Sequence, residues 1–112
     1  MAKLFTYGIL KKSKGGISLM KHLAPGSKYI KEDSITATLY TVGYDPASIS
    51  FIKLGGGKVK GSLYKVPDNQ FREIDYLESA YNRVTTITCS GIKAFVYEGI
   101  YRGIFPHPTG NW

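Results

Sequence analysis

The sequence predicts one α+β domain in which several strands curl around a core and one main helix interrupts them. The chain has 112 residues, which is the length of a single domain. Nine tyrosines and thirteen glycines favour strands and tight turns over a helical bundle. Segments with strand patterning outnumber helical ones. This pattern favours a sheet that closes or curls into a barrel, although it also permits a sandwich.

The first part of the chain is expected to form strands and one short helix. Residues 3–10 are apolar on both faces, as in a core strand. Residues 17–23 have apolar side chains at helical spacing, and the Ala-Pro-Gly sequence at 24–26 ends that helix. Residues 29–40 have the composition of one or two strands.

The middle of the chain is expected to form two further strands. They cover residues 49–54 and 59–66, and the glycines at 55–57 form a tight connection between them. Gly61 lies inside the second strand. A glycine there indicates a bulge or the close approach of another backbone.

The main helix is predicted after Pro67, where Asp68 or Asn69 can cap the first turn. Apolar side chains then recur at helical spacing and form one stripe. They are Phe71, Ile74 and Leu77. Glu78 follows directly after this stripe, which places a carboxylate at the end of the helix.

The last part of the chain is expected to form a hairpin. Residues 81–89 and 94–101 alternate as strands do, and Gly91 turns the chain between them. Cys89 is predicted to be a small core residue. Residues 106–112 contain two prolines and a glycine, which indicates an irregular tail to the single domain of residues 1–112.

The small numbers of cysteine and histidine residues, together with the hydropathy of the chain, restrict the class of protein. One cysteine and two histidines do not supply the four ligands of a structural zinc site, so no metal is expected. One cysteine also permits no internal disulfide, as in a reducing compartment. The apolar segment near the start is too short for a signal peptide, and no apolar run could cross a bilayer. We therefore expect a soluble, cytoplasmic protein without a membrane partner.

The formal charge of +7 is concentrated in the first third of the chain. Residues 1–31 contain seven lysines and no acidic residue. These lysines could attract an anionic partner such as nucleic acid, or they could form a solvated basic surface. No nucleic-acid-binding motif accompanies them, so both interpretations stay open.

Four segments carry recognisable motifs in a fixed order, at residues 4–10, 59–64, 75–83 and 94–97. Together they resemble motifs of the γ-glutamylcyclotransferase family, including its short γ-glutamylamine cyclotransferase and AIG2-like members. Residues 4–10 (Leu-Phe-Thr-Tyr-Gly-Ile-Leu) resemble the Tyr-Gly-Thr/Ser-Leu loop after the first strand. Residues 59–64 (Val-Lys-Gly-Ser-Leu-Tyr) resemble the Val-x-Gly-Glu-Leu-Tyr strand. Residues 75–83 resemble the Leu-Glu…Tyr-x-Arg block, and residues 94–97 the closing strand. Two positions depart from the pattern, Ile9 for Thr or Ser and Ser62 for Glu.

This resemblance implies a small mixed β-barrel and a cyclisation reaction. In that reaction the α-amine of a γ-glutamyl group attacks its own γ-carbonyl, which gives 5-oxoproline and a free amine. The substrate supplies the nucleophile, so neither a metal nor a cofactor is implied. The partner implied is a small γ-glutamyl compound. A pocket of the same fold without catalytic activity is the alternative, with Ile9 and Ser62 as signs of divergence.

The resemblance also implies which residues form the site. Glu78 corresponds to the catalytic acid and base, which takes a proton from the α-amine and returns one to the leaving nitrogen. The backbone of Tyr7, Gly8, Ile9 and Leu10 corresponds to the loop that holds the substrate. Tyr81 is expected to line the pocket, as are Tyr44 and Tyr97 with less support. Arg83 is expected to pair with a carboxylate of the substrate or with Glu78.

Overall fold

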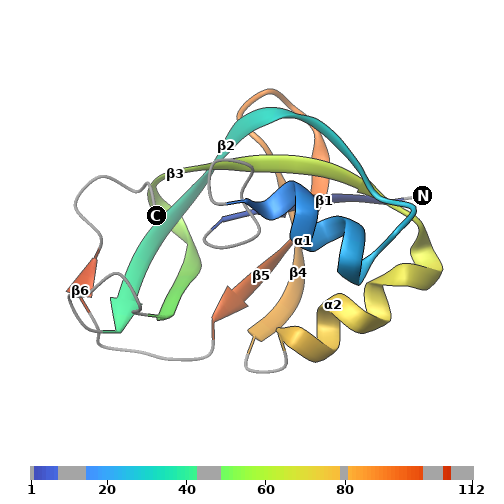
Figure 1. The fold of residues 1–112 in the computed structure, drawn as a ribbon. Helices are drawn as coiled ribbons and strands as arrows, with labels where there is room; N and C mark the ends of the chain where they lie inside the picture. Colours follow the sequence, from blue (N-terminus) through green and yellow to red (C-terminus); the bar gives the residue numbers. More distant parts are fainter. Residues whose placement is uncertain (1, 8–14, 43–48, 79–80, 100–104, 107–112) are drawn as a thin grey trace.

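The computed structural model describes residues 2–7, 15–42, 49–78, 81–99 and 105–106. Six strands and two α-helices follow one another along these segments (Figure 1). The elements are β1 (Ala2–Thr6), α1 (Gly16–Leu23), β2 (Lys28–Val42), β3 (Ile49–Val66), a 3-10 turn η3 (Asp68–Gln70), α2 (Phe71–Leu77), β4 (Tyr81–Ile87), β5 (Lys93–Gly99) and β6 (Phe105–Pro106). No described helix has the length and apolar character needed to span a bilayer.

The strands form one sheet in the order β4-β5-β1-β3-β2-β6. Strand β1 lies near the middle, antiparallel to β3 and parallel to β5. The start of β3 also meets β5, where Ile52 pairs with Glu98. The sheet is therefore strongly coiled around β1, which confirms the predicted α+β class. It is a barrel only in a loose sense, because no pairing among the described residues joins the outer strands β4 and β6.

Strand β3 is longer than the sequence suggested. The glycines at 55–57 do not separate two strands, because β3 runs through them from Ile49 to Val66. Gly55 and Gly56 have φ angles of 92° and 88°. The register with β2 shifts at the same place, between Thr36 and Ala37. These glycines thus form an irregularity that bends a continuous strand, and the prediction of a connection was wrong.

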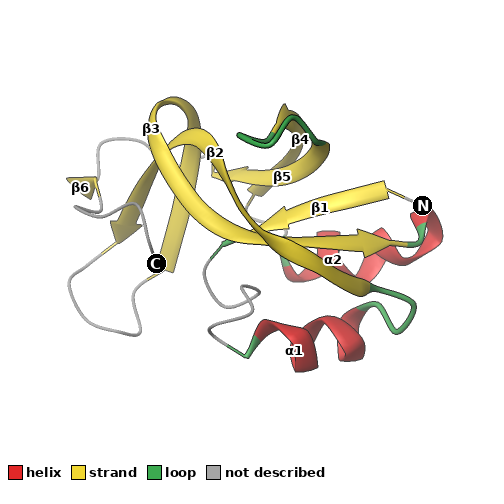
Figure 2. Cartoon of the chain, turned by 90° about the horizontal axis from the view of Figure 1, so that it is seen from above, coloured by secondary structure: helices red, strands yellow, loops and turns green. Residues whose placement is uncertain are grey.

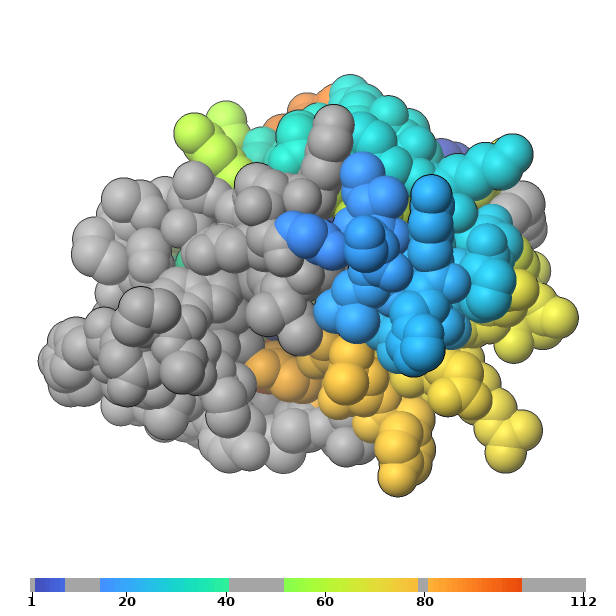
Figure 3. Space-filling view, in the orientation of Figure 1, coloured from blue at the N-terminus to red at the C-terminus, as the bar shows by residue number. Residues whose placement is uncertain are grey.

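Both helices lie on the same side of the sheet (Figure 2). In the space-filling view α1 (blue) stands beside the first part of β2 (cyan), with α2 (yellow) below it (Figure 3). Gln70 ties the two helical regions together, since its Oε1 accepts a hydrogen bond from the N–H of Gly26 at 2.8 Å. Because the helices cover one side of the coiled sheet, each central strand has one face toward the helices and one toward the inside of the coil.

Two apolar clusters occupy these two faces. The helix-side core consists of Leu4, Met20, Ala24, Tyr64, Val66, Phe71, Ile74 and Tyr97. The interior core consists of Phe5, Ile35, Ala37, Leu39, Ile52, Val59, Leu63, Ala94 and Val96. Adjacent residues of β1 enter different cores, Leu4 the first and Phe5 the second. This confirms that β1 is apolar on both faces.

Gly61 allows β1 and β3 to pack closely. A Cβ atom at this position would lie 2.1 Å from the carbonyl oxygen of Thr6 and 2.6 Å from the Phe5 ring. No side chain fits at either distance. The close backbone approach predicted for Gly61 is confirmed, and it holds the end of β1 against β3.

Three local predictions were wrong. Leu77 is 46% exposed, because α2 ends at this residue before its stripe completes another turn. Neither Asp68 nor Asn69 caps a helix through its side chain, since α2 begins after Gln70 and without a side-chain cap. Cys89 is exposed, because β4 ends at Ile87 and Cys89 lies in the turn that follows.

Candidate active site

Glu78 stands at the junction between α2 and β4. Its N–H donates to the carbonyl of Ile74, and its carbonyl accepts from the N–H of Tyr81, both at 2.9 Å. These two bonds fix the backbone of Glu78 between the helix and the strand. The side chain is half-buried, and burial raises the pKa of the Glu78 carboxyl above its ordinary value. A raised pKa moves a carboxyl toward the range in which it can both accept and donate a proton.

Tyr7, which follows the end of β1, is held in place by its hydroxyl. The hydroxyl donates to the carbonyl of Tyr97 at 2.6 Å and accepts from the N–H of Ile52 at 3.3 Å. Burial raises the pKa of Tyr7 well above its ordinary value, and electrostatic interactions with Tyr81 and Glu78 raise it further. Tyr7 therefore joins β5 to β3 within electrostatic reach of Glu78.

Tyr97 and Arg83 connect the hairpin to α2 through Asp75. The hydroxyl of Tyr97 donates to Asp75 Oδ1 at 2.7 Å, and the Arg83 guanidinium lies 3.5 Å from Asp75 Oδ2. The guanidinium also lies over the rings of Phe71 and Phe95, at 4.5 and 4.9 Å from their centroids. These contacts hold the end of α2, and with it Glu78, against the sheet.

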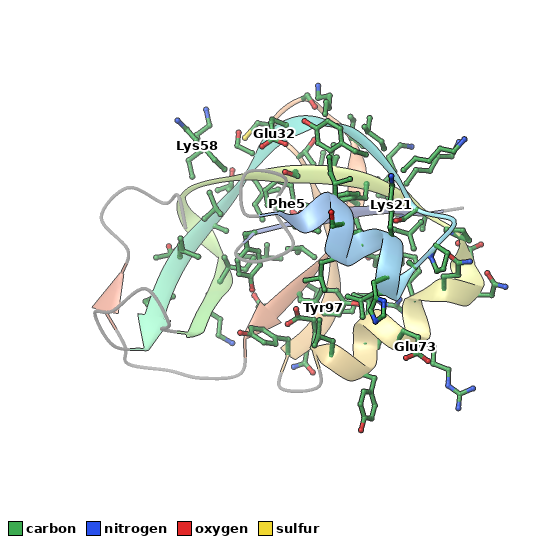
Figure 4. The ribbon with its side chains drawn as sticks, viewed as in Figure 1. Phe5, Lys21, Glu32, Lys58, Glu73 and Tyr97 are labelled. Carbon is green, nitrogen blue, oxygen red and sulfur yellow. The ribbon has the colours of Figure 1, made fainter. Side chains whose placement is uncertain are left out.

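The groups around the Tyr97 hydroxyl raise its pKa. Burial and the hydrogen bond to Asp75 raise this pKa, and the charge of Glu78 adds to the increase. Tyr97 points from β5 toward the helices, whereas Glu73 points outward from α2 (Figure 4). Glu78 and Glu73 thus differ in environment although both belong to the same helical region.

The strand register aligns five polar residues in one row on the helix side of the sheet. Arg83 pairs with Tyr97, Thr6 with Ser62, and Ser62 with Glu32. Leu4 pairs with Phe95 where β1 runs parallel to β5. Thr6 and Tyr97 each follow this pair by two residues, so they are neighbours on the same face. We call this set the polar row. In strand order it reads Arg83, Tyr97, Thr6, Ser62 and Glu32.

The polar row borders the helix-side core. A second row lies next to it on the same face of these strands. It contains Phe95, Leu4, Tyr64 and Tyr29, which pack in that core or against it. The strand order places Glu32 at one end of the polar row and Tyr97 toward the other. Figure 4 shows these two side chains well apart. Glu78 acts on Tyr97, so a half-buried carboxyl stands near one end and a second carboxylate at the other.

Glu32 belongs to a cluster of hydroxyl groups. Ser62 Oγ donates to Glu32 Oε2 at 2.6 Å, and the Tyr29 hydroxyl donates to the same oxygen at 2.9 Å. The hydroxyl of Tyr64 is buried beside them and has no hydrogen-bond partner within the described segments. Burial raises the pKa of Tyr64 to about 12, and Glu32 and Tyr29 contribute to the increase. We call Glu32, Ser62, Tyr29 and Tyr64 the Glu32 cluster.

Some of the predicted site residues meet in this arrangement. Tyr81 and Glu78 both lie within electrostatic reach of Tyr7. Arg83 pairs with Asp75 instead of Glu78. Gly8, Ile9, Leu10 and Tyr44 lie outside the described residues.

Sequence reasoning missed Asp75, Thr6 and Glu32. Asp75 had a local signal, because it precedes Glu78 by three residues and so shares its side of the helix. Glu32 is 30 residues from Ser62 in the sequence and had no such signal. No group of three or more His, Cys, Asp or Glu side chains in the described segments is arranged to hold a metal ion.

Comparison with known families gives a match over nearly the whole chain. The profile of the family described as "Gamma-glutamyl cyclotransferase, AIG2-like" matches residues 4–112. This range contains Glu78, Tyr7 and the whole polar row.

Solved structures share the fold. An uncharacterised protein, PH0828, from Pyrococcus horikoshii is 28% identical, with a TM-score of 0.74 over 99% of this chain and 89% of that one. An AIG2-like protein (GGACT) from Mus musculus is 18% identical, with a TM-score of 0.78 over 100% of this chain and 88% of that one. A curated relative, "Uncharacterized protein 7" of Halorubrum pleomorphic virus 1, is 39% identical over 41 residues, which are 37% of this chain and only 15% of the relative.

Proposed function

Because the chain belongs to the γ-glutamyl cyclotransferase, AIG2-like family, we propose that it cyclises a γ-glutamyl amine or peptide to 5-oxoproline. Glu78 acts as the general acid and base, and the amine is released. The reaction needs neither metal nor cofactor, since the attacking nitrogen belongs to the substrate. The partner is a small γ-glutamyl compound.

The observation that supports this proposal most is the environment of Glu78. Its backbone is fixed by hydrogen bonds on both sides, and burial raises its pKa. A carboxyl at the surface would be ionised and weakly basic at neutral pH, whereas a raised pKa brings it closer to that of the groups it must exchange protons with. Tyr7 and Tyr97 on the sheet lie within its electrostatic reach.

The proposed reaction balances without another reactant. The α-ammonium of the substrate gives one proton to the Glu78 carboxylate. The free amine nitrogen then attacks the γ-carbonyl carbon and forms the ring bond. When the amide bond to the leaving nitrogen breaks, Glu78 returns its proton to that nitrogen. The ring nitrogen then gives up its second proton to the Glu78 carboxylate, which passes it to the released amine, so the products are the lactam and an ammonium ion. Holding the glutamyl chain folded adds to the rate, because oriented intramolecular reactions reach effective molarities of about 10⁵–10⁸ M.

The other residues take supporting roles in this proposal. Tyr7 positions the segment that follows β1, and the amides of Gly8, Ile9 and Leu10 bind the substrate carboxylate or the oxyanion. Tyr81 lines the pocket beside Glu78. Arg83 has the weakest support as a substrate ligand, because Asp75 and two aromatic rings already hold its guanidinium.

The test is release of 5-oxoproline from a panel of γ-glutamyl amines and dipeptides. Glu78→Gln should reduce kcat by about 10²–10⁴-fold, the usual contribution of general acid–base catalysis, while the fold is retained. Glu73→Gln is the matched control, since it makes the same change at an exposed position of α2. A Glu78→Gln protein that keeps most of its turnover would rule out the assignment. Ligand binding without turnover by the natural chain would instead identify a binding module.

A further inference from the structure

We propose that the outer edge of β4 pairs with the same edge of a second copy of this chain. The result is a two-fold symmetric dimer in which one sheet runs through both subunits. This inference goes beyond the proposed reaction and does not depend on it.

The two outer strands of the sheet differ in how they are protected. Strand β6 has only two residues, and one of them, Pro106, has no N–H to donate. Strand β4 has seven residues, and no other described strand pairs with its outer edge (Figure 2). Natural proteins shield such edges with lysine, proline or a bulge. Strand β4 contains neither residue, and its register with β5 is continuous, so this edge is open to another strand.

The hairpin shows which backbone groups of β4 point outward. The N–H of Thr88 donates to the carbonyl of Ile92 at 2.8 Å, so this is a hydrogen-bonded pair. Hydrogen-bonded and non-hydrogen-bonded pairs alternate along an antiparallel ladder. Counting back from Thr88, the even-numbered residues of β4 bond to β5, and the odd-numbered ones direct their N–H and C=O groups outward. At three exposed positions these groups are offered to a partner, namely Arg83, Thr85 and Ile87.

A two-fold axis at Val84 gives the register that suits the side chains. Ile87 is 59% exposed, and in this register it lies opposite the partner's Tyr81. Pairs of an aromatic and a β-branched residue stabilise antiparallel strands. On the other face Val84 meets the partner's Val84. A register centred on Thr85 would instead set the apolar Ile87 against a guanidinium.

Charge also favours a second copy at this edge. The chain carries a net charge of +7, so most contacts between two copies are repulsive. Arg83 is the only charged residue of β4, and Asp75 of its own chain pairs with it. The proposed register places each Arg83 opposite a Thr85, so no like charges face each other across the new strand pair.

The dimer would extend the surroundings of the candidate active site. Tyr81 packs against the helix-side core, and its N–H donates to the carbonyl of Glu78 at 2.9 Å. Because the two-fold axis stands perpendicular to the sheet, the helices of both subunits lie on the same side. The partner's Ile87 therefore covers Tyr81 close to the end of α2.

The first experiment measures mass against concentration by sedimentation. The natural chain should form dimers, and Thr85→Pro should raise the dissociation constant roughly 10–100-fold, because it removes an outward N–H from each subunit. The fold does not use this N–H, so urea unfolding should show a folded monomer. Thr85→Val, which keeps the N–H, is the matched control and should dimerise as the natural chain does. A natural chain that stays monomeric even at millimolar concentration, or a Thr85→Pro protein that dimerises equally well, would overturn the proposal.

The second experiment tests the register by cross-linking. Cys89 is exposed, so both variants carry Cys89→Ser. Val84→Cys should form a disulfide-linked dimer on mild oxidation, since Cα atoms of a non-hydrogen-bonded pair lie about 4.5 Å apart, within the range for a disulfide. Thr86→Cys is the matched control, because it is half-buried on the same face but lies about 13 Å from its counterpart in the partner.

Each outcome of the cross-linking is decisive. A link at position 84 that is absent at position 86 would support the interface, including the case in which Thr85→Pro does not fold. No link at either position, or equal links at both, would overturn it. Neither experiment measures turnover, so a failed interface leaves the cyclotransferase proposal intact.

Discussion

The two faces of the central sheet differ in what they contain. The interior core is made of aliphatic residues, alanines and Phe5, and Tyr7 packs against it. The helix-side core contains two tyrosines, and polar groups border it along the polar row. The same strands build both faces, because successive side chains point to opposite sides. The interior face therefore mainly stabilises the fold, whereas the helix side also carries the side chains of the polar row.

The unpartnered Tyr64 hydroxyl and the raised pKa of Glu78 both belong to the helix side. Each opposes stability, since burial disfavours both an unpaired hydroxyl and a carboxylate. A protein retains such features where they serve a purpose other than packing. The comparison thus predicts that substitutions on the two faces change different quantities.

The largest effect on stability is expected in the interior core. Leu63 is completely buried there, so Leu63→Ala should lower the free energy of unfolding by about 2–5 kcal/mol through lost burial and a cavity. Leu54→Ala is the control, because Leu54 on the same strand is 39% exposed and should change stability by less than about 0.5 kcal/mol. Urea unfolding measures both. Similar losses in the two variants would contradict the assignment of Leu63 to a close-packed core.

A smaller effect is expected where the hairpin meets α2. Asp75→Asn keeps an acceptor for Tyr97 but removes the charge that faces Arg83. Because this ion pair is partly exposed, stability should fall by only about 0–1 kcal/mol. We expect a larger fall in kcat, since the pair helps to position the end of α2 that bears Glu78. Thermal unfolding and turnover, measured on the same preparation, test this. A loss of stability without loss of kcat would show that Asp75 only supports the fold.

The smallest effect concerns Glu78 itself and depends on pH. Its pKa is raised in the folded state, so the folded protein binds this proton more tightly than the unfolded chain. The resulting stabilisation is present below the ordinary pKa of about 4.5 and is lost as pH rises through the raised value. Relative to the natural chain, Glu78→Gln should therefore gain stability as pH increases from acid to neutral. Unfolding curves at several pH values measure this difference, and an opposite trend would refute the burial argument.

Patterns that depend on near neighbours were predictable from the sequence. The alternation in β1 identified a strand buried on both faces, and Gly91 identified the turn of the β4–β5 hairpin. Glu78 was placed at the end of the main helix because the stripe of Phe71 and Ile74 precedes it. Helical and strand periods act over a few residues, so the sequence alone contains this information.

Errors arose where distant segments decide the local structure. The glycines at 55–57 look like a turn, but pairing with β2 on both sides keeps them within one strand. Leu77 has the spacing of a buried residue, but it is the last residue of α2 and is exposed. Cys89 alternates with Ile87, but the pairing with β5 ends at Ile87. In each case the extent of pairing or packing overrides the local pattern.

By itself the sequence determined the fold class, most of the elements and the carboxylate at the end of the main helix. Only the tertiary structure brought Arg83, Tyr97, Thr6, Ser62 and Glu32 into one row and set Glu32 against Ser62. The physical reason is that the period of a strand fixes which residues share a face, whereas the register between strands fixes which of them are neighbours. Register is set by packing the whole sheet, and no short segment encodes it.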